Sequence, residues 1–109
     1  MPRGTKELPT AFTQAVHAEI NELMRQRGIS QRKLEELSGV KQPRLSQTIG
    51  KNARSLDLTE LDRICEALGA SPEAVVATAE RVLQARSAYA LAAKEAPAPA
   101  ADINEEDYL

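Results

Sequence analysis

The sequence predicts an all-α fold, and three observations support the prediction. Apolar residues make up 42% of the 109-residue chain, but only three residues are aromatic, so a core must be built from Leu, Ile, Val and Ala. The apolar positions recur at the spacing of a helix rather than alternating as in a strand. Residues that typically begin and end helices interrupt this pattern at short intervals, which indicates several short helices.

The first two helices are predicted between Thr10 and Gly28 and between Ser30 and Gly39. Thr10 and Ser30 are good N-caps, and Gly28 and Gly39 are good helix stops. The residues expected to face inward are Phe12, Val16, Ile20, Leu23, Met24, Leu34 and Leu37. His17, the single histidine, has no second ligand or nucleophile placed beside it by a motif, so we expect it on the polar face.

Three further helices are predicted. One starts near Lys41 or Gln42, has Pro43 in its first turn and runs to Ile49. The next opens at Asp57 with Glu60 as a capping box, closes at Gly69, and is expected to turn Leu58, Leu61, Ile64, Cys65 and Leu68 inward. The last starts at the sequence Ser71-Pro72-Glu73 and has no breaker before Pro97, which is longer than a small domain needs.

These elements divide the chain into four predicted parts. They are an N-terminal arm (1–9), a helical domain (10–80), a helix extension (81–94) and a disordered tail (95–109) that is rich in Ala, Pro and acids. The single cysteine, the absence of a signal peptide and the lack of a long apolar run predict a cytoplasmic protein without a membrane segment. No catalytic constellation or metal-ligand spacing is present, so we expect neither an enzyme nor a cofactor.

Charge is strongly segregated along the chain, although the net charge is only −2. Residues 25–54 hold eight basic and two acidic residues, which gives +6, and residues 95–109 hold five acids and no base, which gives −5. Residues 38–56 contain no acid at all. The positive charge therefore surrounds the predicted helix from residue 42 to 49, which favours a nucleic-acid partner.

The helices on either side of Gly39 form a helix-turn-helix, the motif that lays its second helix in the DNA major groove. The stretches ISQRKLEELSGVKQPRLSQTIG and LDLTELDRICEALGASPEAV resemble the Cro/repressor (XRE-type) helix-turn-helix family over roughly residues 12–76. The resemblance implies a five-helix, lambda-repressor-like domain. Lys41 and Pro43 depart from the family pattern, which commonly has a Ser or Thr cap and a polar reading residue there.

The resemblance also implies which residues contact DNA. Base readout is expected from Gln42, Pro43, Arg44, Ser46 and Gln47, with Pro43 against a thymine methyl and Arg44 on either guanine or a phosphate. Phosphate contacts are expected from Gln31, Arg32, Lys41, Lys51, Asn52 and Arg54. Two alternatives stay open: residues 39–50 bind protein instead, or Arg32 and Lys33 form a solvated face with an ion pair from Arg32 to Glu36.

The sequence thus predicts a transcriptional regulator, a small phage-type or bacterial repressor, that binds a palindromic operator in double-stranded DNA as a homodimer. Dimerisation is expected through the helix extension, at Val82, Leu83, Tyr89 and Ala90; the alternative is that this extension frays. The second function considered is an antitoxin-like module, which regulates its own gene and binds a protein partner with its C-terminal region.

Overall fold

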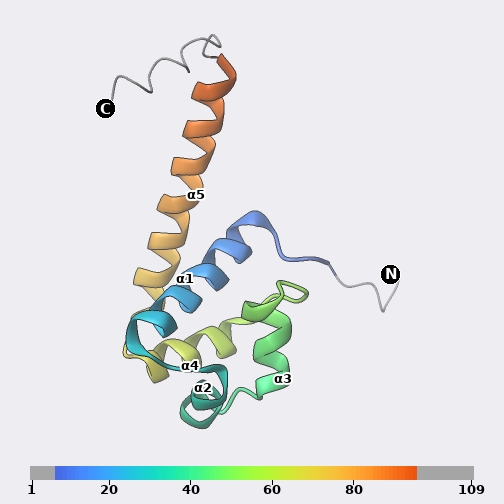
Figure 1. Ribbon diagram of the computed structural model, residues 1–109, viewed down its shortest axis with the longest axis vertical. Coiled ribbons are helices and arrows are strands. Elements are labelled where there is room, and N and C mark those ends of the chain that lie inside the picture. Colours follow the sequence, from blue (N-terminus) through green and yellow to red (C-terminus); the bar gives the residue numbers. More distant parts are fainter. Residues whose placement is uncertain (1–6, 96–109) are drawn as a thin grey trace.

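The computed structural model describes residues 7–95, with side chains to residue 92, and these residues form helices without any strand (Figure 1). The elements are α1 (Ala11–Arg27), α2 (Gln31–Ser38), α3 (Gln42–Leu45), the π-helical turn η1 (Ser46–Gly50), α4 (Leu58–Leu68) and α5 (Pro72–Glu95). The all-α prediction is confirmed for the described part. None of these helices has the length and apolar character needed to cross a membrane.

The helix boundaries follow from local capping chemistry. The side chains of Thr10, Ser30 and Asp57 accept hydrogen bonds from backbone N–H groups three residues ahead, which satisfies amides that the first helical turn leaves unpaired. Asp57 and Glu60 form a complete capping box. These three starts and the start of α5 at Pro72 agree with the sequence predictions.

One apolar core joins the helices. It contains Ala15, Val16, Ile20, Met24, Leu34, Val40, Leu45, Ile49, Leu61, Ile64, Cys65, Leu68, Val75 and Ala79. Cys65 is fully buried as expected, and burial raises the pKa of its thiol. The core therefore packs α2, α3 and α4 together under α1 and the first half of α5.

Three apolar residues predicted to face inward do not. Phe12, Leu37 and Leu58 are 37%, 48% and 82% exposed, which corrects the prediction for each. All three lie within two residues of a helix end, where the neighbouring helices no longer cover them. Phe12 and Leu58 border a small groove between α1, α4 and α5.

His17 is the reverse case. The prediction that it lies on the polar face of α1 is wrong, because its side chain is only 1% exposed. It sits three residues before Ile20 and seven before Met24, on the same buried stripe of α1. Two hydrogen bonds to the loop after η1 satisfy the ring nitrogens and so offset the cost of burying a polar ring.

The second half of α5 extends away from the other helices (Figure 1). Val75 and Ala79 are buried, but no side chain from residue 80 to 92 is. Among the four residues expected to form a dimer contact, Leu83 is half-buried, whereas Val82, Tyr89 and Ala90 are exposed. Tyr89 reaches 77% exposure, so this part of the helix presents apolar side chains to solvent.

A pair of α4 variants tests the core. We expect Ile64→Ala to lower the free energy of unfolding by about 2–5 kcal/mol, because Ile64 is fully buried, and Leu58→Ala to lower it by less than about 0.5 kcal/mol. Urea unfolding followed by circular dichroism measures both. Equal losses for the two variants would contradict the placement of α4.

Candidate nucleic-acid interface

The turn between α2 and α3 is built by Ser38, Gly39 and Val40. Gly39 has a φ of 82°, in the left-handed region that glycine adopts without strain, and its N–H donates to the Glu35 carbonyl. The Ser38 hydroxyl donates to the Leu34 carbonyl and accepts from the Val40 N–H. Val40 is buried directly after the turn. This geometry fixes the direction in which the next helix leaves the core.

Residues 42–50, which comprise α3 and η1, are called the recognition segment below. Lys41 precedes the segment and makes no side-chain cap, as its sequence led us to expect. The cap comes instead from α2, where a carboxylate oxygen of Glu35 accepts from the Gln42 N–H at 3.1 Å. A carboxylate at a helix N-terminus also interacts favourably with the helix dipole. Glu35 was missed in the sequence because it lies seven residues before the amide it caps.

The second half of the recognition segment widens into a π-helical turn rather than continuing as the predicted α-helix to Ile49. The buried Thr48 hydroxyl donates back to the Arg44 and Leu45 carbonyls, a bond that competes with regular helix pairing. From α1, the Asn21 side-chain amide donates to the Ile49 carbonyl at 2.8 Å. The end of the segment is thereby attached to α1.

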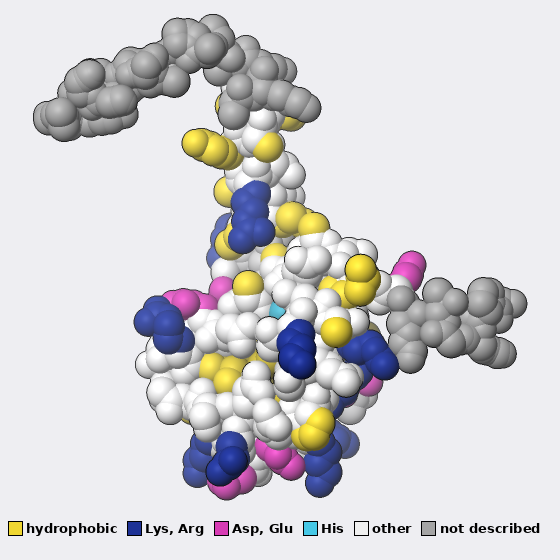
Figure 2. Space-filling model, turned by 45° about the vertical axis from the view of Figure 1, so that its right-hand side comes forward, with side chains coloured by type: hydrophobic (Ala, Val, Ile, Leu, Met, Phe, Trp, Pro, Cys, Tyr) yellow, Lys and Arg dark blue, Asp and Glu magenta, His cyan; other side chains and the backbone are white. Residues whose placement is uncertain are grey.

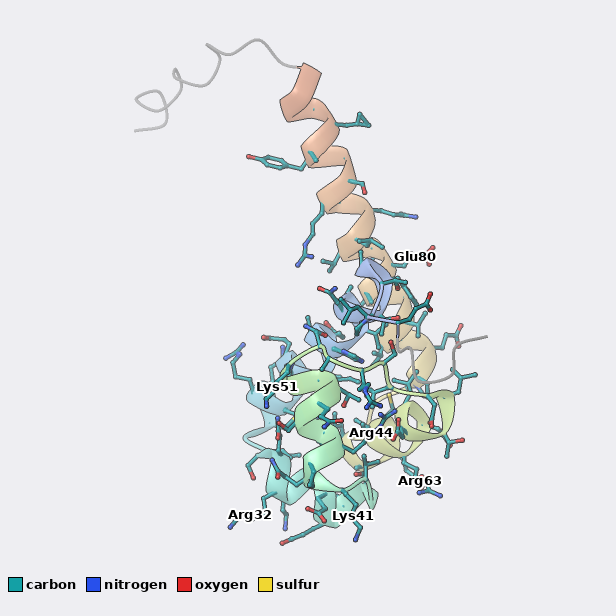
Figure 3. All side chains as sticks on the ribbon, turned by 90° about the vertical axis from the view of Figure 1, so that its right-hand side faces the viewer. Arg32, Lys41, Arg44, Lys51, Arg63 and Glu80 are labelled. Atoms are coloured by element: carbon teal, nitrogen blue, oxygen red, sulfur yellow. The ribbon has the colours of Figure 1, made fainter. Side chains whose placement is uncertain are left out.

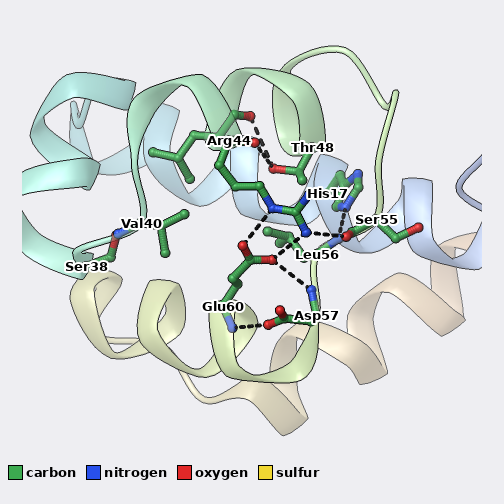
Figure 4. A network of polar contacts seen from close by, with 10 residues as sticks. His17, Ser38, Val40, Arg44, Thr48, Ser55, Leu56, Asp57 and Glu60 are labelled. Carbon is green, nitrogen blue, oxygen red and sulfur yellow. Dashed lines mark hydrogen bonds and ion pairs between the residues drawn. The ribbon is translucent and has the colours of Figure 1, made fainter. Parts of the chain in front are cut away.

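A bidentate ion pair joins the recognition segment to α4. Arg44 Nε donates to Glu60 Oε2 at 2.7 Å, and Arg44 Nη2 donates to Glu60 Oε1 at 2.9 Å (Figure 4). Arg44 Nη2 also donates to the Ser55 carbonyl at 3.0 Å. Glu60 is at the same time the second member of the capping box with Asp57. One carboxylate therefore closes the start of α4 and holds the middle of the recognition segment.

Electrostatics reinforces this pair. The Arg44 guanidinium lowers the pKa of Glu60 below its ordinary value, against the opposing effect of partial burial. The sequence led us to expect Arg44 to reach guanine or a phosphate. In the structure its guanidinium bonds Glu60 and the Ser55 carbonyl, and it lies to the α4 side of the segment (Figure 3).

The other predicted reading residues lie on the recognition segment itself. Pro43 and Gln47 are exposed, and Gln42 and Ser46 are half-buried. The Gln42 amide nitrogen donates to Gln31 Oε1 at 2.8 Å, which links the starts of α3 and α2. That nitrogen has a second hydrogen and the Gln42 side-chain oxygen keeps its lone pairs, so a two-bond contact with adenine stays chemically available.

The predicted phosphate-contacting residues surround the segment. Arg32, Lys41 and Lys51 are exposed around α3 in Figure 3, and Gln31, Asn52 and Arg54 are half-buried. The loop after η1 folds back on it, since the Ala53 and Arg54 N–H groups both donate to the Gln47 carbonyl. Gly50 leaves room for Gln31, because a Cβ atom there would lie 3.1 Å from the Gln31 amide nitrogen.

The ion pair considered from the sequence as an alternative role for Arg32 is not present among the described residues. The described residues contain a Lys33–Glu36 ion pair at 3.5 Å rather than the Arg32–Glu36 pair considered from the sequence. Arg32 is thus left exposed at the edge of the segment. Figure 2 shows Lys and Arg side chains spread over the body of the protein and also on the projecting half of α5, with Asp and Glu side chains beside some of them.

Together these features define a class: a helix-turn-helix protein whose second helix has Arg32, Lys41 and Lys51 exposed around it. The model of the Cro/C1-type HTH DNA-binding domain matches residues 19–76, more than half of the chain. The chain belongs to this family.

Two solved structures share the fold. A crystal structure of the clp gene regulator ClgR from Corynebacterium glutamicum is similar over 81% of this chain and 92% of its own, with 25% sequence identity and a TM-score of 0.67. A second crystal structure of ClgR from C. glutamicum covers 65% of this chain and 91% of its own, with 27% identity and a TM-score of 0.59. No curated protein sequence matches the chain.

The Arg44–Glu60 pair makes stability depend on pH in a defined window. The folded-state pKa of Glu60 lies below its unfolded value of about 4.5, so its contribution is complete above that pH and is lost as the pH falls through the folded pKa. Below about pH 5, we expect wild type to lose stability more steeply than Glu60→Gln, as measured by urea unfolding. Glu66→Gln, an exposed position of the same helix, is the control. Parallel curves for wild type and Glu60→Gln would contradict the pair.

Proposed function

We propose that this protein is a sequence-specific, DNA-binding transcriptional regulator that places residues 42–50 in the major groove. The observation that carries the proposal is the recognition segment, which is acid-free and presented to solvent by contacts from α1, α2 and α4. Membership in the Cro/C1-type family supports DNA as the ligand.

Four side chains are proposed to read bases. Gln42 and Gln47 suit adenine, Ser46 accepts or donates a single bond, and Pro43 fits a thymine methyl group. Arg44 has a different role in this proposal from the one expected from sequence. Because Glu60 holds it, Arg44 fixes the orientation of the segment instead of touching DNA.

Backbone contacts are proposed for the basic and amide side chains around the segment. Lys41, Lys51, Arg54 and Arg32 supply charge, and Gln31 and Asn52 supply neutral donors. The local charge of +6 over residues 25–54 attracts the DNA phosphates, although the net charge of the whole chain is −2.

We further propose that the protein binds a palindromic operator as a homodimer through the exposed half of α5. One helix-turn-helix makes few base contacts, each worth about 1–3 kcal/mol, so two half-sites raise specificity. In the described residues the apolar side chains of Val82 and Tyr89 are exposed and that of Leu83 is half-buried. Ala90 lets two helices approach closely.

The relative named a gene regulator supports a role in transcription. We propose repression, in which an occupied operator excludes polymerase. The protein partner considered for the acidic tail depends on residues 96–109, which lie outside the described residues, and no second function is proposed.

Selection of bound sequences from a random duplex pool tests this function. We expect a palindromic motif with half-sites about 10 base pairs apart, one helical turn of DNA. Recovery of unenriched sequence, together with no binding at low ionic strength, would overturn the proposal.

The salt dependence of DNA binding separates the two proposed roles of basic side chains. We expect Lys51→Met to reduce the slope of log K against log salt by about one unit, because one phosphate contact is lost. Arg44→Met is expected to weaken binding with the slope unchanged. A one-unit reduction for Arg44→Met would show that Arg44 leaves Glu60 for a phosphate.

The dimer is tested by charge placed on α5. Leu83→Glu is expected to lower the molar mass measured by light scattering to that of a monomer and to weaken operator binding, because a buried charge opposes helix pairing. Gln84→Glu adds the same charge one residue further on and is expected to leave both unchanged. Unchanged mass and affinity in Leu83→Glu would refute the α5 dimer.

A further inference from the structure

The chain has a single histidine, and the structure buries it at the back of the proposed DNA interface. His17 comes from α1, yet both of its hydrogen bonds reach the loop that follows the recognition segment. Nδ1 lies 2.7 Å from Asn52 Oδ1, and Nε2 lies 3.3 Å from the Leu56 backbone nitrogen (Figure 4 shows the Leu56 bond).

These two partners fix the state of the ring. The Leu56 N–H is a donor, so Nε2 must carry a lone pair and no hydrogen. In a neutral imidazole the hydrogen then sits on Nδ1, which donates to Asn52 Oδ1. The geometry therefore requires the neutral Nδ1–H form of His17.

The bond also fixes which way the Asn52 amide points. With Oδ1 held by His17, the Nδ2 group is left on the other side of the amide, and it has no hydrogen-bond partner among residues 7–92. Asn52 is the single non-glycine residue with a positive φ, 56°, in this part of the chain. Its backbone is attached to the segment by the N–H bond to the Thr48 carbonyl.

We propose that His17 is a positioning residue for DNA binding: in its neutral form it holds the loop of residues 51–56 so that Asn52 Nδ2 donates to a DNA phosphate, and its protonation releases this loop. The inference rests on the proposed function and assigns a regulation by pH to the same interface. Asn52 is the residue that touches the backbone, and His17 acts through it.

Protonation removes the bond to the Leu56 N–H, whereas the Nδ1–H bond to Asn52 persists in the imidazolium, so the loop is released at its Leu56 end. A hydrogen on Nε2 would face the Leu56 N–H, and two donors cannot bond each other. From α3 the ring faces Arg44, which Glu60 neutralises, and from the start of α4 it faces Asp57 across a shared groove. Burial, and to a lesser extent Arg44, lower the pKa of His17, while the Asn52 bond raises it. The release is therefore expected below its ordinary value of 6.5.

The expected change of DNA affinity with pH is opposite to the change that electrostatics alone would give. An added positive charge beside DNA would tighten binding as the pH falls, and phosphates would raise the pKa of a nearby histidine. If protonation instead releases a phosphate contact, binding weakens on acidification. By linkage, DNA then lowers the pKa of His17. The pKa falls by one unit for each tenfold by which protonation of His17 weakens DNA binding.

The test is a pH titration of the imidazole by nitrogen-15 NMR on the full chain, with and without a short random-sequence DNA duplex at low ionic strength. Because the chain has one histidine, its signals need no assignment. We expect the Nδ1–H form in the free protein and a pKa that is lower by about one unit on DNA. An Nε2–H form, or a pKa raised or unmoved by DNA, would overturn the proposal.

Two variants give an independent readout. Asn52→Gly tolerates the positive φ and is expected to weaken DNA binding about tenfold at about pH 8, where His17 is neutral. His17→Gln is expected to remove the loss of affinity that wild type shows between about pH 8 and about pH 5.5. A wild-type loss that persists in His17→Gln would refute the role of His17. No DNA binding by wild type at any pH would instead refute the proposed function.

Discussion

The structure depends on one constraint: the element proposed to contact DNA is too short to hold its own shape. The recognition segment has four α-helical residues followed by a five-residue π turn, and isolated helices of that length are unstable in water. Its conformation is imposed by the rest of the domain: Leu45 and Ile49 are buried in the core, and polar side chains from other helices bond the segment. Glu35 caps its start, Glu60 holds Arg44 in its middle, and Asn21 bonds the carbonyl near its end.

This arrangement couples folding to the shape of the interface. Glu60 serves the α4 capping box and the Arg44 ion pair together, so a change there disturbs both the start of α4 and the recognition segment. His17 likewise joins two elements, because its two hydrogen bonds connect α1 to Asn52 and Leu56 in the loop after the segment. Gln47 and Lys51 are exposed and take no part in these contacts, so their side chains are available to DNA.

Most of the fold could be predicted from local signals. Thr10, Ser30, Asp57 and Pro72 start their helices where the sequence indicates, since capping depends on residues only two or three apart. The polar contacts of the interface could not be predicted, because they join residues far apart in the chain: His17 to Asn52, and Arg44 to Glu60. One signal was present: the spacing of His17 to Ile20 and Met24 places it on the apolar stripe of α1.

The most direct test of the account is to map DNA contacts by backbone amide NMR during titration with a DNA duplex. We expect the largest chemical-shift changes at residues 31–32 and 41–54, around the exposed side of the recognition segment. Changes concentrated on α1 and α5, with residues 42–47 unmoved, would contradict it.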